Sequence, residues 1–241
     1  MIIRNLEDKV ARCYAEDSAQ FSDFMTMEEI SQADRLLRNT GLYYRFWGGY
    51  DGAQRQMVML SVDEVPADYP LVILCGQWDK FAEISHRDIL GAVLASGIER
   101  RCIGDILFDG VKRKFYLFAL SRMSDYISKT VTQAGRCSIS WSVVNDLSVL
   151  PQQPIQEHKV SVPSLRIDAV ISSVFHLSRQ KALDLISEKR VFVDHSLVVK
   201  VTHSLHEGCS VVVRGHGKFI FVEQSGLSKK GKLYILIKQY M

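Results

Sequence analysis

Apolar residues follow helical and strand spacing along most of the chain, beginning in the first 70 residues. A capping box, Thr26-Met-Glu-Glu29, precedes apolar positions three and four apart, which predicts a helix over residues 27–38. Alternating apolar residues then predict strands over 42–47 and 56–62. The glycine-containing loop between them, residues 48–52, lacks the Lys-Ser/Thr of a phosphate-binding loop, so a hairpin connection is favoured.

The next 80 residues predict helices and strands in a strict order. The order is strand 71–75, helix 86–95, strand 105–108, strand 114–120, helix 122–134 and strand 137–144. This β-α-β-β-α-β order is the ferredoxin-like layout that many RNA-recognition modules share. Tyr116 and Phe118 lie on one face of the third strand, but the glycine-containing basic-aromatic signature of such modules is missing. Core packing is therefore favoured over base stacking for both rings.

The last 80 residues predict two helices followed by strands. Ser164 is expected to cap a helix with apolar positions 167, 170, 171 and 174, and Ser178 to cap a shorter second helix. The chain is then expected to turn at 189–190 and 194–195, with strands over 191–193, 198–201, 209–213 and 219–222.

Prolines divide the chain. Pro151, Pro154 and Pro163 fall in a polar stretch, which predicts a linker over residues 151–163. Pro66 and Pro70 mark a second boundary near residue 70. The expected fold class is α+β, in three small modules: an N-terminal α+β domain (1–70), a ferredoxin-like, RRM-like βαββαβ domain (71–150) and a C-terminal domain (164–241).

Charge is distributed unevenly over these modules. The 241 residues carry a net charge of only +3, but residues 159–241 hold 13 Lys and Arg against six Asp and Glu. Residues 1–158 hold 17 basic against 21 acidic side chains. The excess of +7 at the C-terminal end points to nucleic acid or an anionic membrane surface. The membrane is disfavoured because the basic segment predicts a compact fold rather than a long cationic amphipathic helix.

Composition excludes several classes of protein. Hydrophobic residues make up 47% of the chain and charged residues 24%, which excludes a disordered or fibrous chain. The five cysteines lie at least 27 residues apart, so neither a disulfide framework nor a zinc ribbon is predicted. The N-terminus is charged where a secretory signal would be apolar, and no apolar run approaches ~20 residues. We therefore expect a soluble, reduced, cytoplasmic protein without a membrane partner.

Cations stand at the ends of the predicted C-terminal elements. Arg179 and Lys181 fall in the first turn of the second helix, beside unpaired backbone N–H groups, a combination suited to a phosphate. Arg214 and Lys218 bracket a glycine-containing turn through which backbone and charge can approach a sugar-phosphate chain. We expect these cations to line one face of the domain.

The C-terminal domain contains four segments with a family pattern: Ser-Leu-Arg-Ile-Asp168, Leu-Ser-Arg-x-x-Ala182, Leu-Ile-x-x-x-x-Val191-x-Val193 and Gly208-x-x-Val-x-Val-Arg-Gly-x-Gly-Lys-Phe219. They closely resemble the αL motif, the small RNA-binding module named after ribosomal small-subunit protein S-four. The chain departs from the module's usual turn residues at three places. It has Lys189 where the module has Gly, Asp194-His195 where the module has Asn-Gly, and Gly208-Cys209 where the module has Gly-Asp. These departures concern hairpin geometry more than RNA binding.

This resemblance implies RNA contacts at seven cations, Arg166, Arg179, Lys181, Lys189, Arg190, Arg214 and Lys218. Arg166 and Asp168 lie two residues apart and are expected on different sides of the helix turn. Asp168 is expected to orient Arg179 or a backbone group rather than to touch a phosphate.

Further motifs lie upstream: Phe46-Trp-Gly-Gly-Tyr50 with Arg55, Ser85-His-Arg-Asp-Ile-Leu-Gly-Ala92, Ser96-Gly-Ile-Glu-Arg100 and Ile103-Gly-Asp-Ile106. In this order the chain resembles the bacterial YlmH family over nearly its whole length. The resemblance implies RNA binding without known catalysis, on ribosomal RNA and tRNA. It further implies association with stalled large ribosomal subunits that hold peptidyl-tRNA, support of a tail-adding quality-control factor, and a genetic link to cell division. No cofactor is implied.

The alternative is an RNA-modifying enzyme, of pseudouridine synthase or methyltransferase type, with its active site in residues 1–150 and the αL motif for docking. Ile167-Asp168 lies in a predicted helix rather than in a synthase catalytic loop, and no Gly-rich strand-to-helix turn offers an adenosylmethionine site. The segment Leu227-Ser-Lys-Lys-Gly-Lys232 resembles a synthetase signature only superficially.

Two other clusters carry side chains that occur in catalytic or metal sites. Ser85-His86-Arg87-Asp88 combines a hydroxyl, an imidazole and a carboxylate, but neighbours in sequence at a helix start do not face one another. A helix cap by Ser85, with Asp88 three residues on, is therefore favoured over catalysis. His203, His206 and Cys209 have metal-ligand spacing but no fourth ligand, so no metal site is expected.

Overall fold

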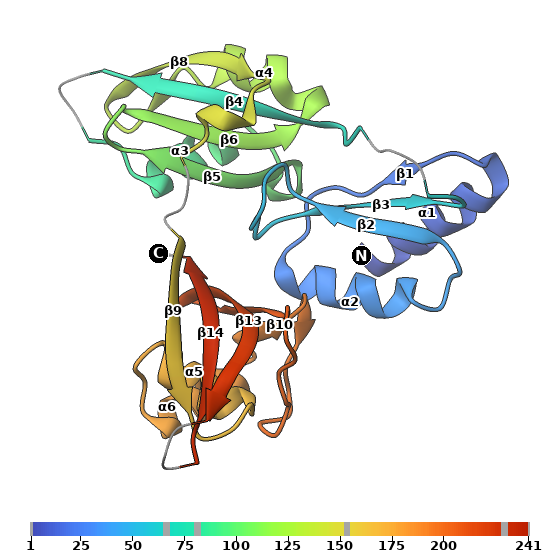
Figure 1. Cartoon of the computed structure of the whole chain (residues 1–241). Helices are drawn as coiled ribbons and strands as arrows, with labels where there is room; N and C mark the ends of the chain where they lie inside the picture. The colour runs from blue at the N-terminus through green and yellow to red at the C-terminus, as the bar shows by residue number, and fades with distance from the viewer. Residues whose placement is uncertain (1, 65–67, 80–82, 152–154, 228–230, 241) are drawn as a thin grey trace. The chain divides into compact units, whose positions relative to one another are not determined.

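The computed structural model describes residues 2–64, 68–79, 83–151, 155–227 and 231–240. Pro66 and Pro154 of the predicted boundaries, and residues 228–230 of the Leu227–Lys232 segment, lie outside the described residues. The chain forms two compact units, Met1–Pro151 and Gln152–Met241 (Figure 1). The first unit has two sheets and the second has one, and each unit is described by itself.

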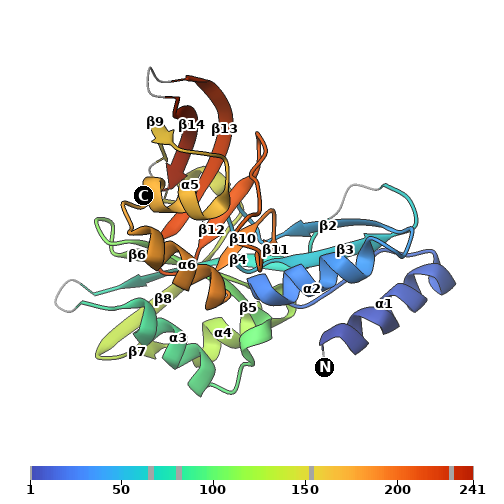
Figure 2. The same ribbon diagram turned by 90° about the horizontal axis from the view of Figure 1, so that it is seen from below.

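The first unit begins with a three-stranded antiparallel sheet. Its strand order is β1-β3-β2, from β1 (Gln20–Phe21), β2 (Tyr43–Trp47) and β3 (Met57–Ser61). Helix α2 (Met27–Leu37) begins at the predicted capping box, because the Thr26 amide donates to Glu29 Oε2 at 2.6 Å and the Glu29 amide to Thr26 Oγ1 at 3.4 Å. Helix α1 (Ile2–Glu16), which the sequence pattern missed, packs beside α2 (Figure 2).

The second sheet of this unit confirms the β-α-β-β-α-β order. Its five antiparallel strands run β5-β6-β4-β8-β7, and helices α3 (His86–Ala95) and α4 (Ser124–Thr130) belong to the same module. The strands are β4 (Leu71–Trp78), β5 (Ile103–Asp109), β6 (Lys114–Leu120), β7 (Gln133–Ala134) and β8 (Cys137–Val144). Together with the other sheets, this arrangement confirms the α+β class.

The predicted helix over 122–134 is wrong at both ends. Residues 121–123 form a 3-10 turn, and α4 ends at Thr130 because β-branched side chains at 130–132 disfavour the helix. Val131 leaves helical geometry with a φ of −95° and a ψ of 71°, and Gln133–Ala134 then pairs with β8.

The two sheets of the first unit share one core. Phe24 and Met57 from the first 70 residues belong to the same buried cluster as strands β4 and β6. A Cβ atom on Gly49 would lie 2.5 Å from the Phe118 ring, and one on Gly104 would lie 2.7 Å from the Phe24 ring. These glycines therefore permit the close approach of the two sheets. The division of residues 1–151 into two domains near residue 70 stays a prediction.

The packing closes the sheet face on which RNA-recognition modules stack bases. Tyr116 is 3% exposed and Phe118 is 0% exposed. Tyr50, in the loop after β2, packs against Phe118 with ring centroids 5.0 Å apart. Both rings are core residues in this structure, as the missing signature predicted.

The second unit is a six-stranded sheet with two helices on one face. The strand order is β11-β10-β12-β13-β14-β9. The strands are β9 (Ile155–Val162), β10 (Val191–Val193), β11 (Ser196–Leu197), β12 (Ser210–Val213), β13 (Gly217–Leu227) and β14 (Leu233–Tyr240). Helices α5 (Ile167–Val174) and α6 (Arg179–Ser187) share the buried core with inward-facing side chains of these strands.

The predicted linker over 151–163 is wrong for most of its length. Residues 155–162 form β9, which pairs with β14 along its whole length. Val162 is buried and Val160 packs against the same core, so two apolar side chains outweighed the polar composition. The C-terminal module accordingly begins before residue 164.

Two further predictions in this unit are wrong. Arg166, not Ser164, is the N-cap of α5, because segment 165–167 is held beside segment 203–205 by Leu205 N to Leu165 O (2.9 Å) and Ile167 N to His203 O (2.8 Å). Residues 198–201 are not a strand, since the return strand β11 ends at Leu197. Neither long-range pairing is visible in local spacing.

Candidate nucleic-acid interface

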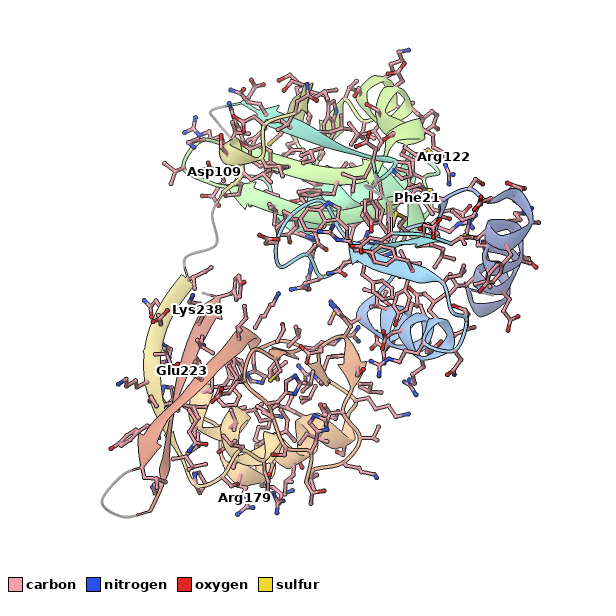
Figure 3. The ribbon with its side chains drawn as sticks, turned by 45° about the vertical axis from the view of Figure 1, so that its right-hand side comes forward. Phe21, Asp109, Arg122, Arg179, Glu223 and Lys238 are labelled. Carbon is pink, nitrogen blue, oxygen red and sulfur yellow. The ribbon has the colours of Figure 1, made fainter. Side chains whose placement is uncertain are left out.

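The junction of α5 and α6 presents the first group of cations. Ser178 caps α6 as predicted, with its Oγ accepting from the Lys181 amide at 3.2 Å. This cap places Arg179 and Lys181 in the exposed first turn of the helix. The unpaired amides of that turn and the helix dipole favour an anion there. Figure 3 shows Arg179 projecting from this end of the unit.

Asp168 is the centre of the group. Its side chain is only 1% exposed, yet it binds two arginines. Arg166 donates through Nε to Oδ1 at 3.1 Å and through Nη2 to Oδ2 at 3.3 Å. Arg179 donates through Nε and Nη2 to Oδ2 at 3.2 and 3.1 Å. The prediction that Asp168 orients Arg179 is confirmed, and the prediction that Arg166 and Asp168 lie on different sides of the helix is wrong. Arg166 precedes the helix, so its side chain can fold back onto Asp168.

This arrangement orients positive charge toward solvent. The side chains of Arg179 and Arg166 remain 66% and 39% exposed. One carboxylate neutralises one of the two guanidinium charges, and Lys181 adds another cation beside them. Guanidinium groups held in this way present N–H donors with a fixed direction, which suits the oxygens of a phosphate.

Lys189 follows α6 and has left-handed backbone geometry. Its φ is +59°, and Asp194 and His195, in the turn between β10 and β11, have φ values of +45° and +65°. These are the positions at which the αL motif has Gly and Asn-Gly. The hairpin register, with Val193 opposite Ser196, is therefore kept by residues other than glycine, at a cost in backbone strain.

Replacing Lys189 with Gly separates this strain from the charge. We expect Lys189→Gly to raise the free energy of unfolding of the second unit by about 1 kcal/mol, because glycine adopts a positive φ without steric cost. If Lys189 contacts a phosphate, the same variant binds RNA more weakly. Circular dichroism melts and RNA titrations measure the two effects.

Lys189→Ala is the matched control, since it removes the cation but keeps a Cβ atom at a φ of +59°. It should lose the same RNA affinity without gaining stability. Loss of stability in the glycine variant would contradict the strain argument.

The second group of cations lies on the other face of the sheet. Val211, Val213 and Phe219 face the helices in the core, so strand alternation turns Val212 and its partner Lys218 to the opposite face. There Lys218 Nζ lies 4.9 Å from the centroid of the Tyr240 ring, and the Arg214 guanidinium lies 5.2 Å from that of Phe192. The expectation that all the cations line one face is therefore wrong.

Arg190 holds the turn between β12 and β13. Its Nη2 donates to the Arg214 carbonyl at 2.7 Å and its Nη1 to Glu188 Oε2 at 3.1 Å. A Cβ atom on Gly215 would lie 2.5 Å from Nη2, so the glycine makes room for this contact. These bonds favour a positioning role for Arg190. Its predicted RNA contact, like those of the other six cations, stays a prediction.

The reactive clusters have structural partners. Ser85 and Asp88 form a capping box at α3, with the Ser85 amide 2.9 Å from Asp88 Oδ2. His206 Nε2 lies 3.3 Å from Asp194 Oδ2, and burial raises the pKa of the Cys209 thiol to about 11. Within the described ranges, no three His, Cys, Asp or Glu side chains are grouped as metal ligands.

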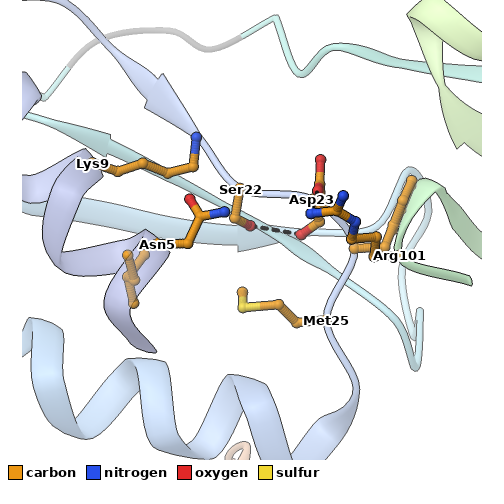
Figure 4. A pocket seen from close by; sticks show the side chains of 8 residues that line it. Asn5, Lys9, Ser22, Asp23, Met25 and Arg101 are labelled. Carbon is orange, nitrogen blue, oxygen red and sulfur yellow. Dashed lines mark hydrogen bonds and ion pairs between the residues drawn. The ribbon is translucent and has the colours of Figure 1, made fainter. Parts of the chain in front are cut away.

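One small hollow opens between α1 and the segment after β1 (Figure 4). Asn5, Lys9, Ser22, Asp23 and Arg101 are among its lining residues, and its volume of about 40 Å³ holds little more than water. Asp23 forms ion pairs with Arg101 (3.4 Å) and Arg122 (3.1 Å), which tie the two sheets together.

Among the described residues, no helix has both the length and the apolar character needed to span a membrane.

Comparisons with known proteins point to an RNA-binding family. A family model described as a putative RNA-binding domain in YlmH matches residues 67–146. The chain is 28% identical over 219 residues to ribosome-associated protein quality control protein P2 of Bacillus subtilis (strain 168), over 88% of this chain and 84% of that protein.

The fold is also similar to a solved structure, cell division protein ylmH from Streptococcus pneumoniae. The TM-score is 0.53 at 17% sequence identity, over 62% of this chain and 93% of that chain. At this identity the likeness shows the fold.

Proposed function

We propose that this chain, a member of the YlmH family, is a non-catalytic protein that binds ribosomal RNA and tRNA. The proposal places it, in the cytoplasm, on stalled large ribosomal subunits that carry peptidyl-tRNA. The relative named as a ribosome-associated quality-control protein supports this setting. A tail-adding quality-control factor as partner and a link to cell division belong to the same proposal.

The observation that carries the proposal is the pair of arginines on Asp168. A buried carboxylate fixes two guanidinium groups at the surface, at the start of two helices, with Lys181 alongside. Such a group matches phosphate in charge and in donor geometry. Such cations bind phosphate rather than a base edge, so the group supports binding through the RNA backbone.

The salt dependence of tRNA binding tests this proposal. For the full chain and labelled tRNA, we expect log affinity to fall with log salt by roughly 0.7–0.9 per phosphate contacted. Arg166→Ala should reduce that slope by about 1, because it removes one oriented cation. Lys159→Ala, on the exposed strand β9, is the matched control and should leave the slope unchanged. A flat salt response of the wild type would overturn the proposal.

A further inference from the structure

Two arginines of the first unit share one backbone oxygen. Arg55 donates through Nε to the Ile103 carbonyl at 2.9 Å, and Arg100 donates through Nη1 to the same oxygen at 2.7 Å. The two nitrogen atoms therefore lie within two hydrogen-bond lengths of each other. Arg55 comes from the loop before β3 and Arg100 from the turn before β5, so the pair forms only where the two sheets meet.

Backbone carbonyls, rather than carboxylates, hold both side chains. Arg55 Nη2 donates to the carbonyls of Phe24 (3.1 Å) and Arg100 (3.3 Å), and Arg100 Nη1 also donates to that of Gly104 (3.1 Å). Among the described residues neither arginine forms an ion pair, in contrast to the adjacent Arg101 on Glu99 (2.8 Å). The carbonyls fix the two guanidinium groups without cancelling their charge.

The nearby carboxylate is occupied by other donors. Asp105 accepts from the Tyr50 hydroxyl at 2.9 Å and from the backbone amides of Gln54 and Arg55 at 2.6 and 3.3 Å. Burial, and then the charge of Arg55, lowers the pKa of Arg100 to about 10. Burial and the charge of Arg100 lower the pKa of His86, at the start of α3. The charge of Asp105 acts in the opposite direction on Arg100 and His86, but it does not outweigh burial and the neighbouring arginine.

Donors remain open on both arginines. Among the described residues, three guanidinium nitrogens have no hydrogen-bond partner: Nε and Nη2 of Arg100 and Nη1 of Arg55. None of the three is fully buried. Two fixed guanidinium groups that each keep an unpaired donor can hold one tetrahedral oxyanion between them.

RNA supplies the oxyanion that fits the rest of this unit. Residues 67–146 match a family model described as RNA-binding, and that range includes Arg100. The stacking face of the sheet is closed, with Tyr116 and Phe118 both buried. An RNA contact of this unit must then be made by another surface, and the backbone phosphate is the group that arginines bind without base stacking.

We propose that Arg55 and Arg100 bind a phosphate of the RNA backbone, as a second RNA contact in addition to the cations of α5 and α6. This inference rests on the proposed RNA-binding function and extends it to the first unit. The site needs both sheets, because each supplies one arginine.

The test compares Arg100→Gln with Arg101→Gln in the full chain, titrated with labelled tRNA over a salt series. Arg100→Gln should lower the salt slope by roughly 0.7–0.9 and the affinity at ~0.15 M salt about four- to fivefold, the share of one phosphate contact. Arg101→Gln removes an equal charge that is already paired with acids, so the slope should not change. Arg100→Lys keeps the charge and should keep most of the slope, which separates binding from damage to the fold.

An unchanged slope in Arg100→Gln, or an equal loss in Arg101→Gln, would overturn the inference. The same comparison in a chain with Arg179→Glu and Lys181→Glu distinguishes it from the proposed function. If the glutamate changes have no effect but Arg100→Gln still weakens binding, the C-terminal site is wrong and the arginine pair stands. If the glutamate changes weaken binding but Arg100→Gln has no effect, only the proposed site at Arg55 and Arg100 is wrong.

Discussion

Changing Arg179 and Lys181 together to glutamate is expected to weaken tRNA binding about 100-fold at ~0.15 M salt. Each phosphate contact contributes roughly 0.7–0.9 to the salt slope, which is about four- to fivefold in affinity at that salt concentration. Removing two such contacts and adding two negative charges beside Asp168 compounds these factors. The affinity would be measured by titrating labelled tRNA with the full chain.

A variant with the same change in net charge controls for general electrostatics. Lys159 and Lys200 are exposed in the same unit, outside the predicted contacts, and Lys159→Glu with Lys200→Glu should cost much less affinity. Circular dichroism must show that both double variants keep their folded spectrum, since Arg179 also binds the buried Asp168. Equal losses in the two variants would mean that overall charge, not the α5–α6 junction, determines binding.

Asp105→Ala is expected to lower the free energy of unfolding of the first unit by about 3 kcal/mol. The substitution removes the acceptor of three hydrogen bonds, from the Tyr50 hydroxyl and the amides of Gln54 and Arg55. The bonds from Tyr50 and Arg55 are part-buried, so these two donors lose their partner without full access to water, whereas the bond from Gln54 is exposed. Burial raises the pKa of the Asp105 carboxyl, while these three hydrogen bonds and the charge of Arg55 act in the opposite direction.

Tryptophan fluorescence during urea unfolding measures this effect. The three tryptophans, Trp47, Trp78 and Trp141, all lie in residues 1–151, so the signal follows the first unit. Asp125→Ala is the control, because Asp125 is 89% exposed and its ion pair with Lys129 spans 3.6 Å. That substitution should change stability by no more than about 0.5 kcal/mol. A loss of less than about 1 kcal/mol in Asp105→Ala would contradict the assigned joint.

Local chemistry predicted the elements that depend on it. Capping boxes at Thr26 and Ser85 determined where α2 and α3 begin, and alternation with turn residues determined β6 and β8. The prediction failed where remote segments decide the outcome. Residues 155–162 have a polar composition, but β14 offers them a full set of hydrogen-bonding partners. Helix α1 was not predicted from local spacing, and it packs against α2 and β1.

The candidate sites divide in the same way. The residue types and spacings around 166–181 predicted the cationic helix start and the role of Asp168 toward Arg179. They did not predict the pair of Arg55 and Arg100, although both residues occur in the motifs that carry the family resemblance. A charge argument could not find that pair, because residues 1–158 have a net negative charge and the two arginines are 45 positions apart.

By itself, the sequence determined the α+β class, the order of the middle module and the concentration of charge in residues 159–241. Those properties follow from spacing, capping and composition, which act within a few turns of chain. The tertiary structure alone decided that the C-terminal cations form two groups on opposite faces of a sheet, that Tyr116 and Phe118 are closed to bases, and that two arginines meet on one carbonyl oxygen. The physical reason is that these outcomes depend on strand register and on packing between segments far apart in the chain, which local periodicity does not encode.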